Sequence, residues 1–445
     1  MDFNTRYAKL NDNQRQAVDY IHGSLLVIAG PGTGKTELLS MRTAQILRQT
    51  DTLPNSILCL TFTESGATNM RQRLRQIIGE DAYKIAIHTF HSFGTEIINQ
   101  HREYFFRGAD AQPVDELTQY QIISGILEEL DWRNPLSAKN NGEFVYIKDL
   151  IRIISEFKQS GLTPSELRAI IEDNQSTIAE IAPDIQQVFS AKISKKTIEM
   201  FVPIAEKIAN LAAKNPDEKN SKLPASITPY ANVLALSIVH ATQEAIDENS
   251  TKPLTAWKNK WCEKNANGEF VLKDFTAAEK LSAAIDVYEK YVNILSERSL
   301  FDYDDMILSV IQACESHPEL RANLQEQFQF IMVDEFQDTN LAQLRLLFNL
   351  TSENDDNPNI MAVGDDDQAI FSFQGADVGN IQRFRQHYHD PKIIVLTDNY
   401  RSAENILSSA RDVITQGADR LENTIDGLSK QLTAHANSEG SKVEI

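Results

Sequence analysis

The sequence predicts an α/β protein, in which a parallel sheet with helices on both faces is interrupted by a large all-helical insertion. Two observations lead to this prediction. Short apolar runs alternate with helical stretches near both ends of the chain, which indicates buried parallel strands. The region from about 95 to 320 instead contains long helical patterns broken by polar loops. We therefore expect one sheet built from both sides of this region.

The individual elements follow from periodicity and from the residues that interrupt it. Before the insertion, we expect helices over 11–22, 35–48 and 64–78 and strands over 24–30, 56–62 and 84–88. Inside the insertion, helical patterns cover 115–131, 143–160, 198–213 and 276–297. After it, strands are expected over 328–334, 359–364 and 392–396.

Composition describes an ordinary globular chain of 445 residues, of which 42% are hydrophobic and 24% charged. No run approaches the roughly 18 apolar residues of a membrane span, and the N-terminus has no apolar signal region. We therefore expect a cytoplasmic protein without membrane contact. The three cysteines, Cys59, Cys262 and Cys314, are far apart and lack metal-ligand spacing, so reduced thiols are expected.

The net charge of −20 argues against a protein that binds nucleic acid with its whole surface. The acidic excess is uneven, because residues 1–110 are close to neutral and carry a basic cluster within 71–75. A local nucleic-acid face is therefore compatible with the composition. We expect the acidic cluster Asp302, Asp304 and Asp305 to be the solvated start of a helix.

The strongest single motif is AGPGTGKT at residues 29–36, between a predicted strand and a predicted helix. Backbone N–H groups bind phosphates where no side chain obstructs them, which explains the glycines, while Lys35 adds a point charge and Thr36 a hydroxyl for Mg²⁺. A strict pattern has Gly in place of Ala29, and the alternative is a glycine-rich turn without a ligand. We expect a nucleotide-binding loop formed by Ala29, Gly30, Pro31, Gly32, Thr33, Gly34, Lys35 and Thr36.

A second motif, IMVDEFQDTN at residues 331–340, ends an apolar run in closely spaced carboxylates. Adjacent carboxylates repel each other and resist burial, so this strand end needs a positive partner. A nucleotide on the glycine-rich loop brings Mg²⁺, which a carboxylate on a neighbouring strand holds. We expect Asp334 to orient the magnesium shell and Glu335 to polarise the attacking water. The alternative for this motif alone is a strand end with solvated acids.

Together with the two motifs above, five further stretches resemble the motifs of the UvrD/Rep-type superfamily 1 DNA helicases. These stretches are LNDNQRQAV around Gln14, LTFTESGATNMRQRL (60–74), HTFHSFG (88–94), VGDDDQAIFSFQGAD (363–377) and LTDNYRS (396–402). All seven motifs follow the family's order. The resemblance implies a RecA-like P-loop NTPase core. Its expected parts are core 1A at 1–95 and 321–400, a 1B-like insertion at 96–320 and an incomplete second core domain (2A) at 401–445.

For the nucleotide, the resemblance implies that Gln14 reads adenine, Arg42 lies beside the base and Tyr400 stacks on it. It also implies that Arg401 reaches the γ-phosphate and that Gln368 couples this phosphate to the DNA track. Without the motif context, a solvated helix face would be favoured for Arg42 and a core position for Tyr400. The implied catalytic residues are Lys35, Glu335, Gln368 and Arg401.

For DNA, the resemblance implies single-stranded bases that stack on aromatic side chains, an interaction that tolerates any base because every base has a π-face. The implied contacts are Phe62, Thr63, His91, Phe371 and Phe373. The last two stand where the family often has Tyr and Trp, and the family's following arginine is replaced, so we expect stacking without an arginine contact. The alternative for Phe62 and Phe371 is a place in the core. Within the insertion, SEFKQSGLTP (155–164) and SLFDYDDMI (299–307) are also similar to family stretches.

The family's later motifs, V and VI, with a second arginine for the ATP site, have no counterpart before Ile445. We therefore expect the N-terminal portion of an ATP-dependent 3′–5′ DNA helicase that uses ATP and Mg²⁺, with DNA repair, recombination, plasmid replication and phage defence as the alternatives for its pathway. It would bind single-stranded DNA and single-strand/double-strand junctions but unwind poorly alone. One alternative is a nucleotide-switched protein that binds DNA, or a protein partner through the insertion. Another is the motor half of a helicase–nuclease. Glu335 and Gln368 argue against a switch, because turnover is what requires them.

Overall fold

The computed structural model describes residues 2–105, 111–189, 192–213, 230–264, 268–273, 278–351, 357–370, 379–389, 391–417, 420–425 and 427–435. The chain divides into two units. The sheet unit consists of Met1–Pro113, Lys158–Gly161 and Ser299–Ile445, and the helical unit consists of Val114–Phe157 and Leu162–Arg298. The expected insertion at 96–320 is longer than the helical unit, because residues at both of its ends belong to the sheet unit.

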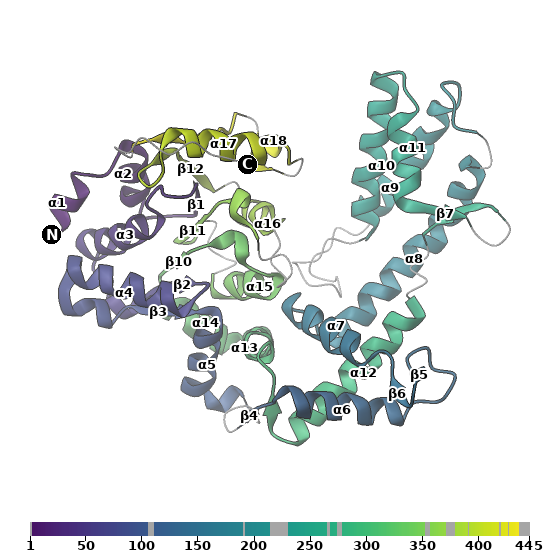
Figure 1. The fold of residues 1–445 in the computed structure, drawn as a ribbon, viewed down its shortest axis with the longest axis horizontal. Coiled ribbons are helices and arrows are strands. Elements are labelled where there is room, and N and C mark those ends of the chain that lie inside the picture. Colours follow the sequence, from purple (N-terminus) through teal and green to yellow (C-terminus); the bar gives the residue numbers. More distant parts are fainter. Residues whose placement is uncertain are drawn as a thin grey trace. The chain divides into compact units, whose positions relative to one another are not determined.

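Six parallel strands form the centre of the sheet unit, in the order β12–β1–β11–β10–β2–β3 (Figure 1). The strands are β1 (Leu25–Ala29), β2 (Ile57–Thr61), β3 (Ala86–Thr89), β10 (Phe330–Val333), β11 (Ile360–Gly364) and β12 (Lys392–Leu396). Every predicted strand is confirmed, and strands from before and after the insertion form one sheet as predicted. Because the strands are parallel, their carboxyl ends meet at one edge, where ligands bind in such sheets.

Helices cover both faces of this sheet because its strands are apolar on both sides. In β1, Leu25 and Val27 pack into one core cluster, whereas Leu26 and Ile28 pack into the other. The first cluster includes residues of α1 (Phe3–Tyr7), α2 (Asp12–Asp19), α3 (Lys35–Gln49) and α4 (Glu64–Ile78). The second includes residues of α5 (Phe90–Gln100), α13 (Asp305–Ser316), α14 (Pro318–Gln327), α15 (Leu341–Leu350) and α16 (Gly379–His387). This confirms the predicted α/β class.

Short elements complete the sheet unit. They are the strand pairs β4 (Gln112–Pro113) with β9 (Leu300–Phe301) and β13 (Asp398–Asn399) with β14 (Thr433–Ala434), and the helices α17 (Glu404–Ile414) and α18 (Leu421–Thr424). Turns of 3₁₀ helix occupy Pro54–Ser56, Gly79–Tyr83, Arg102–Tyr104, Phe336–Asp338 and Asp366–Gln368.

The helical unit has a core of its own, in which Phe189 packs against Phe201, Trp257 and Phe270. Its helices are α6 (Glu116–Glu128), α7 (Ile147–Gln159, whose last residues belong to the sheet unit), α8 (Pro164–Phe189), α9 (Val202–Ala213), α10 (Tyr230–Asp247), α11 (Lys252–Trp261) and α12 (Ala278–Glu297), with a 3₁₀ turn at Ile198–Phe201. The predicted helices are thus present. Two antiparallel strand pairs accompany them, so the insertion is not purely helical: β5 (Lys139–Asn140) with β6 (Glu143–Phe144) and β7 (Cys262–Lys264) with β8 (Phe270–Leu272).

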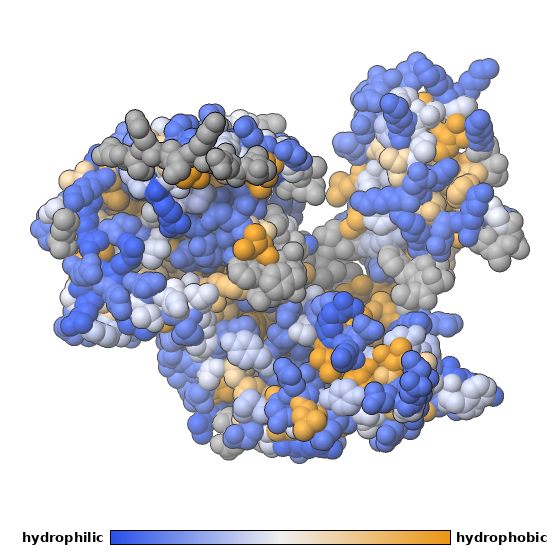
Figure 2. All heavy atoms as spheres, viewed as in Figure 1, coloured by the Kyte–Doolittle hydropathy of each residue, from blue (hydrophilic) through white to orange (hydrophobic). Residues whose placement is uncertain are grey.

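Hydrophilic residues cover most of the visible face of each unit (Figure 2). Across the described ranges, no helix is both long and apolar enough to cross a bilayer. Cys59, Cys262 and Cys314 are buried free thiols, as predicted. Burial raises the pKa of each to about 12, so they remain protonated at neutral pH.

The expectation of a solvated acidic helix start before α13 is wrong. Lys158 has a fully buried side chain, and its Nζ lies 2.5 Å from Asp302 Oδ2 and 2.5 Å from Asp305 Oδ1. Burial raises the pKa of Asp305 to about 6, although the ammonium opposes this shift. Since the lysine lies 144 residues before Asp302, the sequence alone gave no reason to pair them.

Candidate nucleotide site and nucleic-acid pocket

The glycine-rich loop joins β1 to α3 at the carboxyl edge of the sheet. Gly32 and Gly34 have φ angles of 71° and 88°, a left-handed conformation that other residues rarely adopt. A Cβ atom at Gly32 would also lie only 2.7 Å from Arg401 Cβ. The hydroxyl of Thr33 donates to the carbonyl of Gly30 at 2.7 Å. Local geometry therefore requires these two glycines and already fixes the shape of the loop.

Lys35 brings three of the predicted motifs together. Its Nζ lies 2.5 Å from Glu335 Oε2 and 3.3 Å from Gln368 Oε1. Glu335 has a φ of 50°, an uncommon conformation for a residue with a side chain, which persists only where the surroundings impose it. The ammonium is thus held by one carboxylate and one neutral amide.

The carboxylates after β10 carry negative charge that the protein does not fully compensate. Burial, and then the neighbouring charge of Glu335, raises the pKa of both Asp334 and Asp338 to about 6, although Lys35 opposes the shift. Among the described residues, Asp338 Oδ1 is buried without a hydrogen-bond partner. Oxygen ligands of this kind are those that Mg²⁺ prefers. These carboxylates and the hydroxyl of Thr36, at the start of α3, are thus donors of the kind that could hold Mg²⁺.

Gln14 and Tyr400, predicted to bind the base, both contact the glycine-rich loop. Gln14 is buried, and its side chain accepts from the amide of Asn11 at 3.1 Å and donates to the carbonyl of Thr33 at 2.9 Å. Tyr400 is 48% exposed, and its backbone N–H donates to the carbonyl of Gly32 at 3.0 Å. The two residues therefore lie next to the loop, and the half-exposed tyrosine ring stacks on His435, with ring centroids 5.4 Å apart.

The structure places Arg42 against the end of α2. Its side chain is buried, and the guanidinium donates to the carbonyls at the end of α2, those of Ala17, Tyr20 and Ile21. Burial lowers its pKa to about 10, so it stays charged at neutral pH. In this structure Arg42 fixes the end of the helix that carries Gln14, and a place beside adenine remains a prediction.

Two buried polar residues that the sequence reasoning passed over join the motifs. The amide of Asn399 donates to the carbonyl of Pro31 and accepts from the backbone N–H of exposed Arg401 at 2.9 Å. Gln337 donates to Glu335 Oε2 at 2.9 Å and accepts from the backbone N–H of Asp365 at 3.0 Å. Gln337 lies in the motif VDEFQDTN, and Asn399 lies in the motif LTDNYRS. The signal that could have identified them was a polar residue at a buried position of each motif.

A separate cavity in the sheet unit brings together two of the residues predicted to bind DNA. Phe62 and His91 line a space of about 360 Å³. His91 stacks on Tyr303, with ring centroids 4.0 Å apart and an angle of 26° between the planes. Burial lowers the pKa of His91 to about 4, so the imidazole is neutral at pH 7. The other lining residues are Thr61, Phe90, Gln159, Tyr303, Asp304, Asn340 and Gln343.

The remaining DNA predictions have other positions. Thr63 is exposed and caps α4, accepting from the backbone N–H of Gly66 at 3.0 Å. Phe371 and Phe373 lie outside the described residues. The pocket also includes Tyr303, which is 65% exposed and which the sequence reasoning did not select, although it lies in the stretch SLFDYDDMI.

Fold and site together define a class of protein. A glycine-rich loop between a buried strand and a helix, with carboxylates at the end of a nearby parallel strand, is a RecA-like P-loop nucleotide-binding domain. The family model described as UvrD/REP helicase N-terminal domain matches residues 10–211 and 185–389. The chain belongs to this family, and the resemblance seen in the sequence is confirmed.

Curated relatives agree with this family. The chain is 28% identical over 419 residues to the ATP-dependent DNA helicase PcrA of Staphylococcus epidermidis, covering 94% of this chain and 41% of the relative. It is 27% identical over 411 residues to the protein of the same name from Staphylococcus aureus, covering 92% of this chain and 40% of the relative. The chain therefore spans about two fifths of the length of these relatives.

Proposed function

We propose that this chain binds ATP with Mg²⁺ and single-stranded DNA as the motor part of a UvrD/Rep-type 3′–5′ DNA helicase or translocase. The observation that carries the proposal is the meeting of Lys35, Glu335 and Gln368, from three separate motifs, at one point beside the glycine-rich loop. We further propose core 1A for the sheet at 1–95 and 321–400, 1B for the insertion at 96–320, and the start of 2A at 401–445. A cytoplasmic location and a part in DNA repair belong to the same proposal.

At the nucleotide, Lys35 has the central role. A phosphate group replaces Glu335 as the counter-ion of its ammonium, which frees the carboxylate to accept a proton from water. Asp334 and Thr36 are the residues that would hold Mg²⁺, which neutralises phosphate charge when bound. Arg401 is exposed at the loop and able to reach a terminal phosphate.

At the nucleic acid, we assign base stacking to the pocket of Phe62, His91 and Tyr303. Neutral aromatic rings suit this task, because they stack on any base through its π-face. Each stacked base contributes about 1–3 kcal/mol. Thr63 and the polar residues of the pocket supply hydrogen bonds to the sugar–phosphate backbone. Single strands and their junctions with duplex DNA are therefore the proposed substrates.

The test is ATPase turnover with Mg²⁺, with and without single-stranded DNA, beside a Lys35→Ala control. Because no second arginine for the ATP site is recognisable in the sequence, we expect nucleotide binding that the control lacks, with little turnover. Strong turnover that DNA stimulates and that the control lacks would instead mean that the ATP site is complete. Failure to bind nucleotide at all would contradict both this function and the alternative, a nucleotide-switched binding protein.

A further inference from the structure

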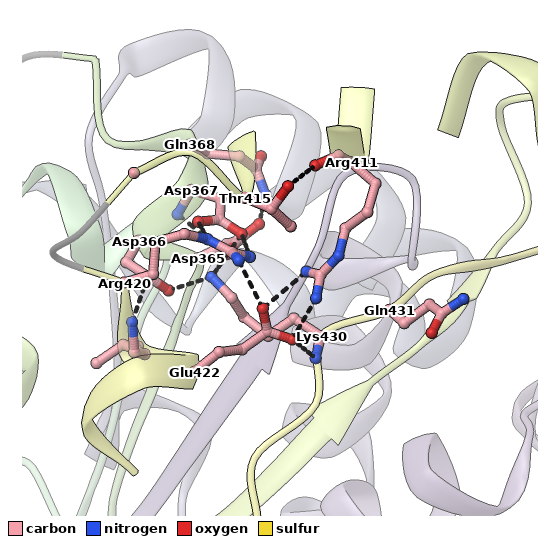
Figure 3. Close-up of polar contacts among 12 residues, drawn as sticks. Asp365, Asp366, Asp367, Gln368, Arg411, Thr415, Arg420, Glu422, Lys430 and Gln431 are labelled. Atoms are coloured by element: carbon pink, nitrogen blue, oxygen red, sulfur yellow. Dashed lines mark hydrogen bonds and ion pairs between the residues drawn. The ribbon is translucent and has the colours of Figure 1, made fainter. Parts of the chain in front are cut away.

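A buried lysine lies at the centre of the acidic turn after β11 (Figure 3). Lys430 Nζ lies 3.0 Å from Asp365 Oδ1, 2.5 Å from Asp366 Oδ1 and 2.7 Å from Asp367 Oδ2. Burial alone would lower the pKa of Lys430, but the three carboxylates outweigh burial and raise it. The lysine, which follows α18 in the chain, is therefore charged at neutral pH.

Two arginines that precede Lys430 in the chain, Arg411 and Arg420, form further ion pairs around this cluster. Arg420 binds Asp367 with two nitrogens, Nε at 2.8 Å from Oδ1 and Nη2 at 2.6 Å from Oδ2. Glu422 pairs with both Arg420 and Arg411 (Figure 3). The spacing of the three aspartates would suit a metal ion, but the ammonium of Lys430 already lies among them. We therefore assign no metal to this cluster.

The cluster is hydrogen-bonded to a side chain at the nucleotide site, that of Gln368. Asp365 Oδ1 accepts from Lys430, and its Oδ2 accepts from Gln368 Nε2 at 2.9 Å. The same Nε2 lies 3.3 Å from the carbonyl of Ala29. With its NH₂ group bound to two acceptors, the amide presents Oε1 to Lys35, 3.3 Å away. The opposite orientation would place oxygen against a carboxylate and NH₂ against an ammonium.

We infer that Lys430, acting through Asp365, fixes the amide orientation of Gln368 and so aims the Lys35 ammonium at the nucleotide phosphates. This inference rests on the proposed function, because it assigns a positioning residue to the same nucleotide site. It connects the segment after α18 to the glycine-rich loop through four side chains. A displacement of that segment would release Gln368 and weaken the hold on a terminal phosphate.

The test is a double-mutant cycle between Lys430 and Gln368, read as the preference for a nonhydrolysable triphosphate over ADP. Both nucleotides are titrated with Mg²⁺ into wild type, Lys430→Met, Gln368→Ala and the double variant. We expect each single variant to lose about tenfold of the preference, the loss expected for a hydrogen bond to a charged group. The double variant should lose no more than Gln368→Ala alone, because both changes remove the same contact.

Two comparisons separate positioning from general stability. Lys430→Arg keeps the charge and should restore part of the preference. Lys158→Met is the matched control, because this lysine is also buried between two carboxylates of the sheet unit, those of Asp302 and Asp305. It should lower the melting temperature yet keep the preference. If Lys430→Met does not fold, Asp365→Asn takes its place in the cycle, since it disturbs the same amide and leaves Lys430 with two aspartates.

The outcomes are distinct. An unchanged preference in Lys430→Met, or independent losses that multiply in the double variant, would overturn the inference and leave the proposed function intact. Loss of preference in Lys158→Met as well would also overturn it, because the effect would then follow stability alone. Wild-type chain that binds neither nucleotide would overturn the proposed function and this inference with it.

Discussion

Two lysine–carboxylate centres of the sheet unit, those of Lys35 and Lys430, differ in how completely the ammonium is compensated. Lys35 faces one carboxylate, Glu335, whose side chain is 36% exposed. Lys430 faces three carboxylates, and its side chain is 6% exposed. An ammonium with a single replaceable partner can exchange that partner for a phosphate. An ammonium that contacts three buried carboxylates is a fixed part of the structure.

The largest expected effect concerns the replaceable partner. Glu335→Gln removes the proposed general base, so turnover should fall by about 10²–10⁴-fold. Binding of Mg²⁺–nucleotide should be kept or tightened, because Lys35 no longer has a competing carboxylate. Steady-state kinetics and nucleotide titration measure the two effects separately. Unchanged turnover would remove Glu335 from its proposed role.

The free energy of unfolding provides a second comparison, between a lysine with a replaceable partner and a lysine fixed among buried carboxylates. Lys158→Met removes the ammonium that compensates the carboxylates of Asp302 and Asp305, and it should lower the free energy of unfolding by about 3–5 kcal/mol. Lys35→Met should cost less than about 1 kcal/mol, because Glu335 can reach water. Urea denaturation of both variants checks this. Equal losses of unfolding free energy in the two variants would mean that the two kinds of lysine do not differ in their contribution to stability.

The nucleic-acid pocket should respond independently of both lysine centres. Phe62→Ala removes one stacking face and should weaken single-stranded DNA binding by about 1–3 kcal/mol, with nucleotide affinity unchanged. Fluorescence anisotropy with a labelled oligonucleotide measures the change. Tyr83→Ala is the control, since Tyr83 is a 55% exposed aromatic of the same unit and does not line the pocket. Equal weakening in both variants would argue against base stacking at Phe62.

The smallest expected effect is a pH dependence at His91. Its pKa is about 4 in the folded protein and about 6.5 when unfolded. The unfolded state therefore binds more protons between these values, and wild type loses stability as the pH falls from 6.5 towards 4. His91→Phe keeps a ring against Tyr303 and lacks this loss. Relative to wild type, the variant should gain stability between pH 7 and pH 5, by less than about 1.4 kcal/mol per unit.

Chemical denaturation at the two pH values checks this prediction. Other groups with raised pKa values, such as Asp305, titrate equally in both proteins and cancel in the difference. The same stability difference at pH 7 and pH 5 would show that His91 is not held neutral by burial.

The sequence predicted what depends on local pattern. Every predicted strand of the sheet was found, because apolar runs such as 24–30 are buried on both faces. The glycine-rich loop was recognisable because its positive φ angles require glycine at fixed spacing. Contacts between distant residues were not predictable in this way. Lys158 with Asp302, and Lys430 with Asp365, join positions whose proximity only the fold creates.

Residue type alone also does not specify the contacts that a side chain makes. Arg42 carries the charge expected near a nucleotide, yet its guanidinium binds the carbonyls that end α2. Tyr303 is an ordinary aromatic in an acidic stretch, and only its stack on His91 places it in a pocket. Periodicity does not encode such contacts, which depend on the ends of elements far apart in the chain.

The most direct test of the account is an equilibrium titration of the chain with Mg²⁺ and a fluorescent, nonhydrolysable ATP analogue, in parallel with Lys35→Ala. The account predicts saturable binding to wild type and an affinity at least about 100-fold weaker in the variant, the loss of a charged hydrogen bond in a buried site. Equal affinity in the two proteins, or no binding to either, would contradict the claim that Lys35 exchanges Glu335 for a phosphate.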